Sequence, residues 1–157
     1  MVVIGYDASD AAEHAIREAG RLLAGKRALV VVVWKQGLGF ELMELPAATI
    51  GMPPTTLDVR TALEIDRELA ASSERLAQKG AALARDAGFT DAEGLAVADD
   101  PDVSVAATIV RVARERDAEG IVVGAHNQGA LSEVLLGSTS RDVIRRADRP
   151  VVVVRES

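Results

Sequence analysis

The stretch Ile121–Ser140, IVVGAHNQGALSEVLLGSTS, says most about the fold of this chain. Its apolar run Ile121–Val123 predicts the end of a buried strand, which Gly124 is expected to stop. Gly137-Ser138-Thr139-Ser140 then leads into Arg141–Ala147, a segment typical of a short helix. The first turn of a helix has backbone N–H groups without internal partners and carries partial positive charge from the helix dipole. A strand, a glycine loop and a helix start in this order indicate a phosphate site made by the backbone.

A plainer interpretation of the same residues stays open. Gly137-Ser138 also fits an ordinary turn and N-cap, because a serine side chain can accept a hydrogen bond from the free N–H groups of a helix start. Gly124 would then only end a strand. Glycine loops before helices are common, so these residues alone do not decide between a cap and a phosphate site.

The spacing Gly124-x-x-Asn127, nine residues, then Gly137-Ser138 resembles the G-2x-G-9x-G-(S/T) nucleotide signature of the universal stress protein family. Asn127 stands where that signature has its second glycine. The opening phrase VVIGYDASDAAEHAIREA is also similar to the family, and the resemblance covers essentially the whole chain. It implies a single Rossmann-like α/β domain over residues 1–157. That domain would have an open five-stranded parallel sheet of order 3-2-1-4-5, with helices on both faces.

Composition agrees with one folded domain and excludes several classes of protein. A length of 157 residues fits one core, and 48% apolar residues exclude a disordered chain. Cysteine is absent, which removes disulfides and thiolate metal sites. A net charge of −6 and a pI of about 5.0 argue against a nucleic-acid partner, which usually requires a basic face.

No secretory signal is visible, because Met1 is followed directly by the apolar run that opens the first predicted strand. The longest strongly apolar stretch, Ala28–Trp34, is far short of the roughly 20 residues of a membrane helix. We therefore expect a cytoplasmic protein that does not enter a membrane.

Apolar periodicity predicts strands alternating with helices from end to end. The strands are expected at Val2–Tyr6, Ala28–Trp34, about Glu93–Val97 at a sheet edge, Gly120–Val123 and Pro150–Arg155. The helices are expected over about Ala11–Ala24 (capped by Ser9 or Asp10), Asp58–Ala87, Val103–Arg116 and Arg141–Ala147, with a variable loop over about 35–57. This alternation is typical of a parallel sheet covered on both faces, which binds ligands at the carboxyl ends of its strands.

The resemblance also implies a set of residues that contact ATP, with or without Mg²⁺. Asp7 would accept a hydrogen bond from the adenine amino group or the ribose, although a solvated or capping aspartate is equally ordinary after a strand. Val33 would pack on adenine, although core packing explains it as well. The full set is Asp7, Ala8, Val33, Val123, Gly124, His126, Asn127, Gly137, Ser138, Thr139 and Ser140.

Asn127 decides whether this site can bind phosphate. Asparagine tolerates the left-handed backbone region better than most residues, so the loop fold can survive without the glycine. Its side chain adds bulk near the phosphates or supplies an amide donor instead. His126, in the same turn, is either a solvated loop residue or a phosphate donor. A dimeric interaction module of the same fold that has lost ATP binding is therefore the alternative to an ATP-binding signalling protein.

Nothing in the sequence identifies a nucleophile or a general base, and no Walker lysine or GxGxxG motif is present. The sequence therefore predicts binding, with slow ATP hydrolysis at most. Asp99, Asp100 and Asp102 are interpreted as an acidic helix start, and no metal site is predicted. The resemblance implies a homodimer through the last strand, Val151–Val154, whose long valine edge invites pairing with another chain.

Overall fold

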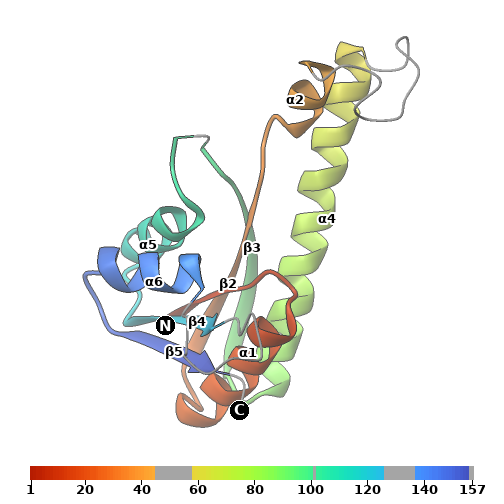
Figure 1. Cartoon of the computed structure of the whole chain (residues 1–157). Coiled ribbons are helices and arrows are strands. Elements are labelled where there is room, and N and C mark those ends of the chain that lie inside the picture. The colour runs from red at the N-terminus through yellow and green to blue at the C-terminus, as the bar shows by residue number, and fades with distance from the viewer. Residues whose placement is uncertain (45–57, 101, 126–136, 156–157) are drawn as a thin grey trace, which may run out of the picture.

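The computed structural model describes residues 1–44, 58–100, 102–125 and 137–155. Its centre is a five-stranded sheet of order β3-β2-β1-β4-β5, in which all neighbouring strands are parallel (Figure 1). The strands are β1 Val2–Gly5, β2 Arg27–Trp34, β3 Asp91–Ala98, β4 Gly120–Ala125 and β5 Val151–Arg155. The predicted fold class and the order 3-2-1-4-5 are confirmed.

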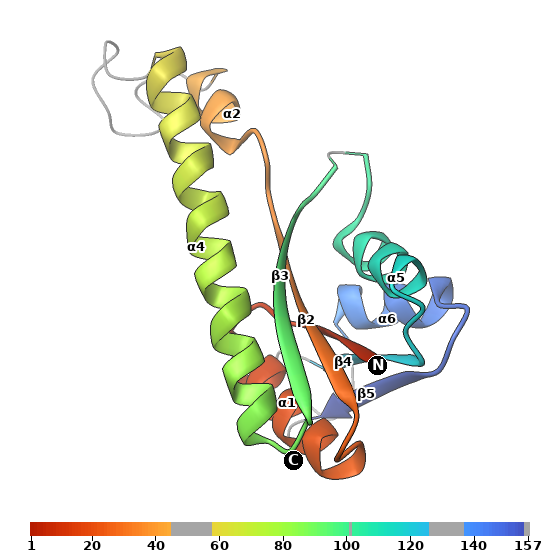
Figure 2. The ribbon, with the colours of Figure 1, turned by 180° about the vertical axis from the view of Figure 1, so that it is seen from behind.

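Helices cover both faces of this sheet. They are α1 Asp10–Leu22, α2 Leu38–Glu44, α4 Val59–Asp86, α5 Val105–Glu115 and α6 Ser138–Arg146. Figures 1 and 2 show α1 and α4 on one face and α5 and α6 side by side on the other. No helix in the described part of the chain is both long and apolar enough to span a bilayer.

Two apolar cores lie on opposite faces of the sheet. Alternate strand residues face each core: Ile4 and Val30 face α1 and α4, whereas Val3 and Val31 face α5 and α6. Burial on both faces explains why the strands are continuous runs of β-branched residues. Small residues let α4 approach the sheet closely, since a Cβ on Gly94 would lie 2.5 Å from the Ala77 backbone.

Several predicted boundaries differ from the structure. Helix α5 begins at Val105 after the Ser104 cap, so the prediction that Asp99, Asp100 and Asp102 form an acidic helix start was wrong. Gly124 does not end its strand, because β4 continues to Ala125, and Gly124 pairs with Val154 of β5. Helix α6 begins at Ser138 rather than Arg141, and β1 ends at Gly5. At Gly124 the ladder to β5 overrides the local tendency of glycine to break a strand.

Part of the predicted loop over 35–57 forms a short helix. The seven residues of α2 pack against α4, where the Asp66 carboxylate accepts hydrogen bonds from the backbone N–H groups of Gly37 (2.9 Å) and Gly39 (3.0 Å). Asp66 therefore caps the start of α2 from a different helix. Residues 45–57 lie outside the described part of the chain.

An ion cluster joins the turn before β5 to the end of α5. Arg149 donates hydrogen bonds to the backbone carbonyls of Ala113 (2.9 Å) and Ala118 (2.5 Å). Asp148 accepts from Arg149 (2.9 Å) and Arg114 (3.1 Å). These two guanidinium groups lower the pKa of Asp148 from 3.8 to about 2.

This lowered pKa predicts a pH-dependent contribution to stability. Asp148 is charged in the fold down to about pH 2, so its contribution is complete above the unfolded pKa of 3.8 and disappears as pH falls through about 2. Thermal melting of Asp148→Asn should show a lower Tm than the unaltered protein at neutral pH, and the difference should close in this acid range. Asp86→Asn is the control, since Asp86 is exposed and forms no ion pair with the described residues. A Tm difference for Asp148→Asn that persists at pH 2 would contradict this account.

Candidate functional site

A cavity of about 480 Å³ opens at the carboxyl edge of the sheet, beside the ends of β1, β2 and β4. The strand order reverses between β1 and β4, which is where sheets of this kind bind ligands. Its volume lies within the roughly 300–1,000 Å³ typical of small-molecule sites. The cavity therefore has both the place and the size expected of a ligand site.

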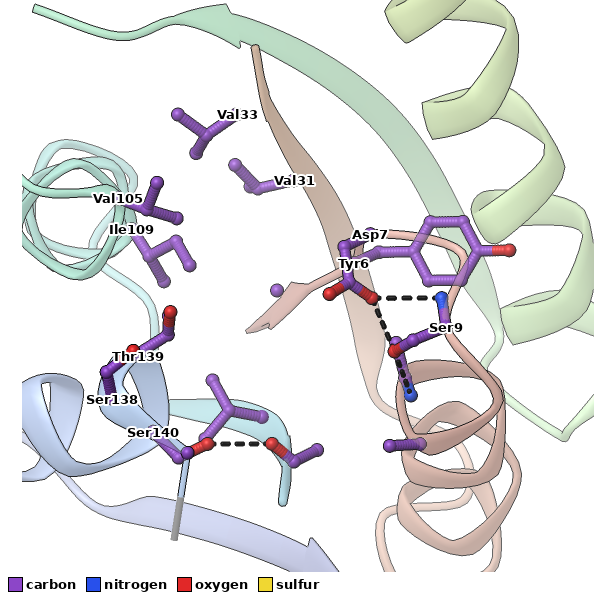
Figure 3. Close-up of a pocket in the computed structure, with 16 residues that line it drawn as sticks. Tyr6, Asp7, Ser9, Val31, Val33, Val105, Ile109, Ser138, Thr139 and Ser140 are labelled. Atoms are coloured by element: carbon purple, nitrogen blue, oxygen red, sulfur yellow. Dashed lines mark hydrogen bonds between the residues drawn. The ribbon is translucent and has the colours of Figure 1, made fainter. Parts of the chain in front are cut away.

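One wall of the cavity is apolar. Val31 and Val33 of β2, Val105 and Ile109 of α5, and Val123 of β4 form this apolar wall (Figure 3). Sequence analysis included only Val33 and Val123 of this wall. Val105 and Ile109 lie four residues apart on one face of a helix that begins at the carboxyl edge, and this spacing was the signal available.

The turn after β1 brings a carboxylate to the same cavity. Asp7 Oδ1 accepts hydrogen bonds from the N–H (3.0 Å) and the hydroxyl (2.6 Å) of Ser9, and its other oxygen points away from Ser9 (Figure 3). Ser9 in turn caps α1 by accepting from Ala12 N–H at 3.2 Å. Asp7 thus supports the cap, as the plainer interpretation held, while keeping a second acceptor atom. Ala8, between Asp7 and Ser9, has a φ of 61°, which is uncommon for a residue other than glycine.

The start of α6 forms a polar wall beside Val105 and Ile109 (Figure 3). Gly137 is the N-cap residue, and within the described part of the chain no side chain caps the first turn of α6. Ser138 is the first helical residue rather than the cap, so the alternative of a serine N-cap is wrong. Ser138 and Thr139 are exposed and line the cavity, which places an uncapped, electropositive helix end on it.

The Ser140 side chain forms a hydrogen bond within the fold that could not be predicted from the sequence. This side chain is buried, and its hydroxyl donates to the carbonyl of Gly124 at 2.7 Å (Figure 3). This bond joins α6 to the end of β4. The hydroxyl hydrogen of Ser140 is therefore already used, although the residue lines the cavity.

Gly124 is required by packing on the other face of the sheet. A Cβ at this position would lie 2.7 Å from the Ala11 carbonyl oxygen and 2.9 Å from its carbon. The start of α1 thus comes too close to β4 for any side chain.

The cavity brings together most of the predicted site residues. It is lined by Asp7, Val33, Val123, Gly124, Gly137, Ser138, Thr139 and Ser140. Ala8 shapes the turn beside Asp7 without lining the cavity. His126 and Asn127 lie outside the described part of the chain.

Tyr6 also lines the cavity, but its hydroxyl points away from it, toward α4 (Figure 3). That hydroxyl lies 3.4 Å from Glu13 Oε1, which also accepts from Lys79 Nζ at 2.9 Å. Burial raises the pKa of Tyr6, and the bond from Lys79 lowers the pKa of Glu13. These groups hold α1 against α4.

Among the described residues no cluster of metal-binding side chains occurs.

The fold and the position of the cavity place the protein among the Rossmann-like α/β proteins. The sequence profile of the universal stress protein family matches residues 44–155, and the chain belongs to this family.

Relatives agree with this assignment. A universal stress protein of Mycolicibacterium smegmatis is 31% identical over 98% of this chain and 47% of its own length. The matches cover about half or less of the length of the curated relatives. Among solved structures, a universal stress protein in complex with cAMP is 24% identical, with a TM-score of 0.61 over 99% of this chain and 96% of its own. One from Archaeoglobus fulgidus in complex with dAMP is also 24% identical, with a TM-score of 0.56 over 97% and 94%.

Gly124 and Gly5 both line the cavity but differ in what surrounds them, which gives a matched pair of substitutions. Gly124→Ala should cost about 1–3 kcal/mol of unfolding free energy, because its methyl group meets rigid backbone of α1. Gly5→Ala should cost under about 1 kcal/mol, because its methyl group meets the flexible end of Ile109 at 3.0 Å and Val123 at an ordinary contact distance of 3.5 Å. Denaturant unfolding of both variants measures the difference, and equal costs would contradict the packing argument.

Proposed function

We propose that this protein binds an adenine nucleotide in the cavity and that its occupancy serves as a signal in a stress response. The base lies against the apolar wall, Asp7 accepts a hydrogen bond from the adenine amino group or the ribose, and phosphate lies at the start of α6. The observation that carries the proposal is the start of α6, which no described side chain caps and which lines the same cavity as the apolar wall and Asp7. ATP, with or without Mg²⁺, is the ligand we propose.

The energetics of such a site suit reversible binding. Each favourable contact between an anion and a helix end is worth about 0.3–1 kcal/mol. Several N–H groups together with burial of a purine can supply the roughly −8 kcal/mol of a micromolar complex. Nucleotide concentration could then set the occupied fraction, as a signal requires.

Binding without rapid turnover fits the chemistry of the described residues better than catalysis does. Asp7 is the only carboxylate among the described residues that line the cavity, and one of its oxygens already accepts two hydrogen bonds. A general base must also reach the proton that it removes. We therefore propose slow ATP hydrolysis at most.

We also propose a cytoplasmic homodimer formed through β5. This strand is the last of the sheet, and Val151–Val154 are only half-buried in the single chain. An unpaired strand edge can extend a sheet into a second copy. Sedimentation velocity at micromolar concentration should give twice the mass of the chain, and a monomer would refute this part of the proposal.

Thermal melting with nucleotide tests binding directly. At about 100 times the dissociation constant a ligand adds roughly 2.7 kcal/mol to the stability of the folded state. Millimolar ATP or AMP should therefore raise Tm, and guanosine nucleotides should raise it less. The absence of any shift would favour the alternative of an interaction module that has lost binding through Asn127. Recovery of the shift in Asn127→Gly would then identify the cause.

Asp7→Asn tests how the base is recognised. Asparagine keeps an oxygen for Ser9 but replaces the second acceptor by an N–H donor. If Asp7 accepts from the adenine amino group, AMP binding should weaken roughly five- to thirtyfold, while binding of inosine monophosphate, which offers an acceptor there, should weaken less. Equal weakening of both nucleotides would assign Asp7 to the ribose. Asp10→Asn is the control, because Asp10 is exposed in the next turn and does not line the cavity.

A further inference from the structure

A second hollow of about 360 Å³ adjoins the cavity and lies between the starts of α5 and α6. We call it the α5–α6 groove. Val105, Ser138 and Thr139 line both the cavity and the groove, so the two hollows meet over the first turn of α6. Asp142 and Arg145 line the groove beyond this point. A ligand with phosphate at the start of α6 can therefore extend directly into the groove.

Helix α6 is basic within an acidic protein. It has three arginines and one aspartate, a formal charge of +2, whereas the whole chain has −6. The aspartate, Asp142, accepts hydrogen bonds from Arg146 (2.8 Å) and Ser104 (3.0 Å), and the first of these lowers its pKa. Arg146 therefore offsets the negative charge of Asp142.

Arg145 also lines the groove, and no described carboxylate forms an ion pair with it. Arg145 forms no hydrogen bond with the described residues either, although it contributes to the electrostatic field at Asp142. Arg145 follows Ser138 by two helical turns, so both lie on one face of α6, about 10 Å apart along its axis. Side chains on a helix lean toward its N-terminus. From the far end of the groove, a side chain at position 145 can therefore reach toward the cavity.

We propose that the α5–α6 groove holds the outer phosphates of a nucleoside polyphosphate and that Arg145 selects for the number of phosphates. This inference rests on the proposed nucleotide site. The first phosphate uses the N–H groups of α6, which a monophosphate offers equally well. Only a diphosphate or triphosphate reaches beyond Ser138 and Thr139 into the groove. The preferred ligand of this chain is then ATP or ADP rather than AMP or cAMP.

Calorimetric titration with AMP, ADP and ATP tests this, using the unaltered protein, Arg145→Gln and a control. The control is Arg116→Gln, which removes the same charge from an exposed position that lines neither hollow. Arg145→Gln should weaken ATP binding roughly three- to tenfold and change AMP binding by less than about twofold, since only ATP reaches the groove. Arg116→Gln should change neither by more than about twofold. Arg145→Lys, which keeps the charge, should retain most of the ATP affinity.

Asp142→Asn provides a test of opposite sign. It removes the carboxylate that faces the groove while keeping an oxygen that can accept from Ser104, so ATP binding should tighten relative to AMP binding. Equal effects of Arg145→Gln on ATP and AMP, or no effect on either, would overturn the phosphate subsite. Similar affinities of the unaltered protein for AMP and ATP would do the same while leaving nucleotide binding intact. If no nucleotide binds, the proposed function fails as well.

Discussion

The end of β4 holds the two sides of the molecule together at a single residue. Gly124 touches the backbone of Ala11 at the start of α1 on one face of the sheet, and its carbonyl accepts the hydroxyl of Ser140 from α6. The starts of two helices are thereby fixed to one strand end. The cavity lies beside Gly124. The distance across it between the turn that contains Asp7 and the start of α6 is therefore set by the contacts of Gly124 with both helices.

The polar groups around the cavity divide into those used by the fold and those left for a ligand. The Ser140 hydroxyl, the Tyr6 hydroxyl and one oxygen of Asp7 take part in internal contacts that hold α1, α4 and α6 in place. The second oxygen of Asp7 and the first-turn N–H groups of α6 are not used in this way by any described side chain. This division favours a rigid binding site, since the groups that would bind a nucleotide are positioned before it arrives.

Charge is distributed unevenly over this acidic chain, and the basic helix is the one that reaches the cavity. The arginines of α6 lie behind its uncapped start, so side-chain charge and helix dipole act in the same direction on an anion there. The Arg149 and Asp148 cluster, at the turn before β5, uses its charges differently, to join α5 to the sheet. Similar residue types thus serve binding at one place and folding at another, according to what surrounds them.

The sequence by itself determined the alternation of strands and helices, because continuous β-branched runs and 3.6-residue apolar periods are properties of near neighbours. The family resemblance supplied the strand order and half of the residues that line the cavity. Only the tertiary structure decided that Gly124 stays within a strand, that Val105 and Ile109 complete the apolar wall, and that Asp66 caps another helix. Each of these depends on a partner far along the chain, 27 residues away for Asp66 and Gly39, and a local pattern contains no information about such a partner.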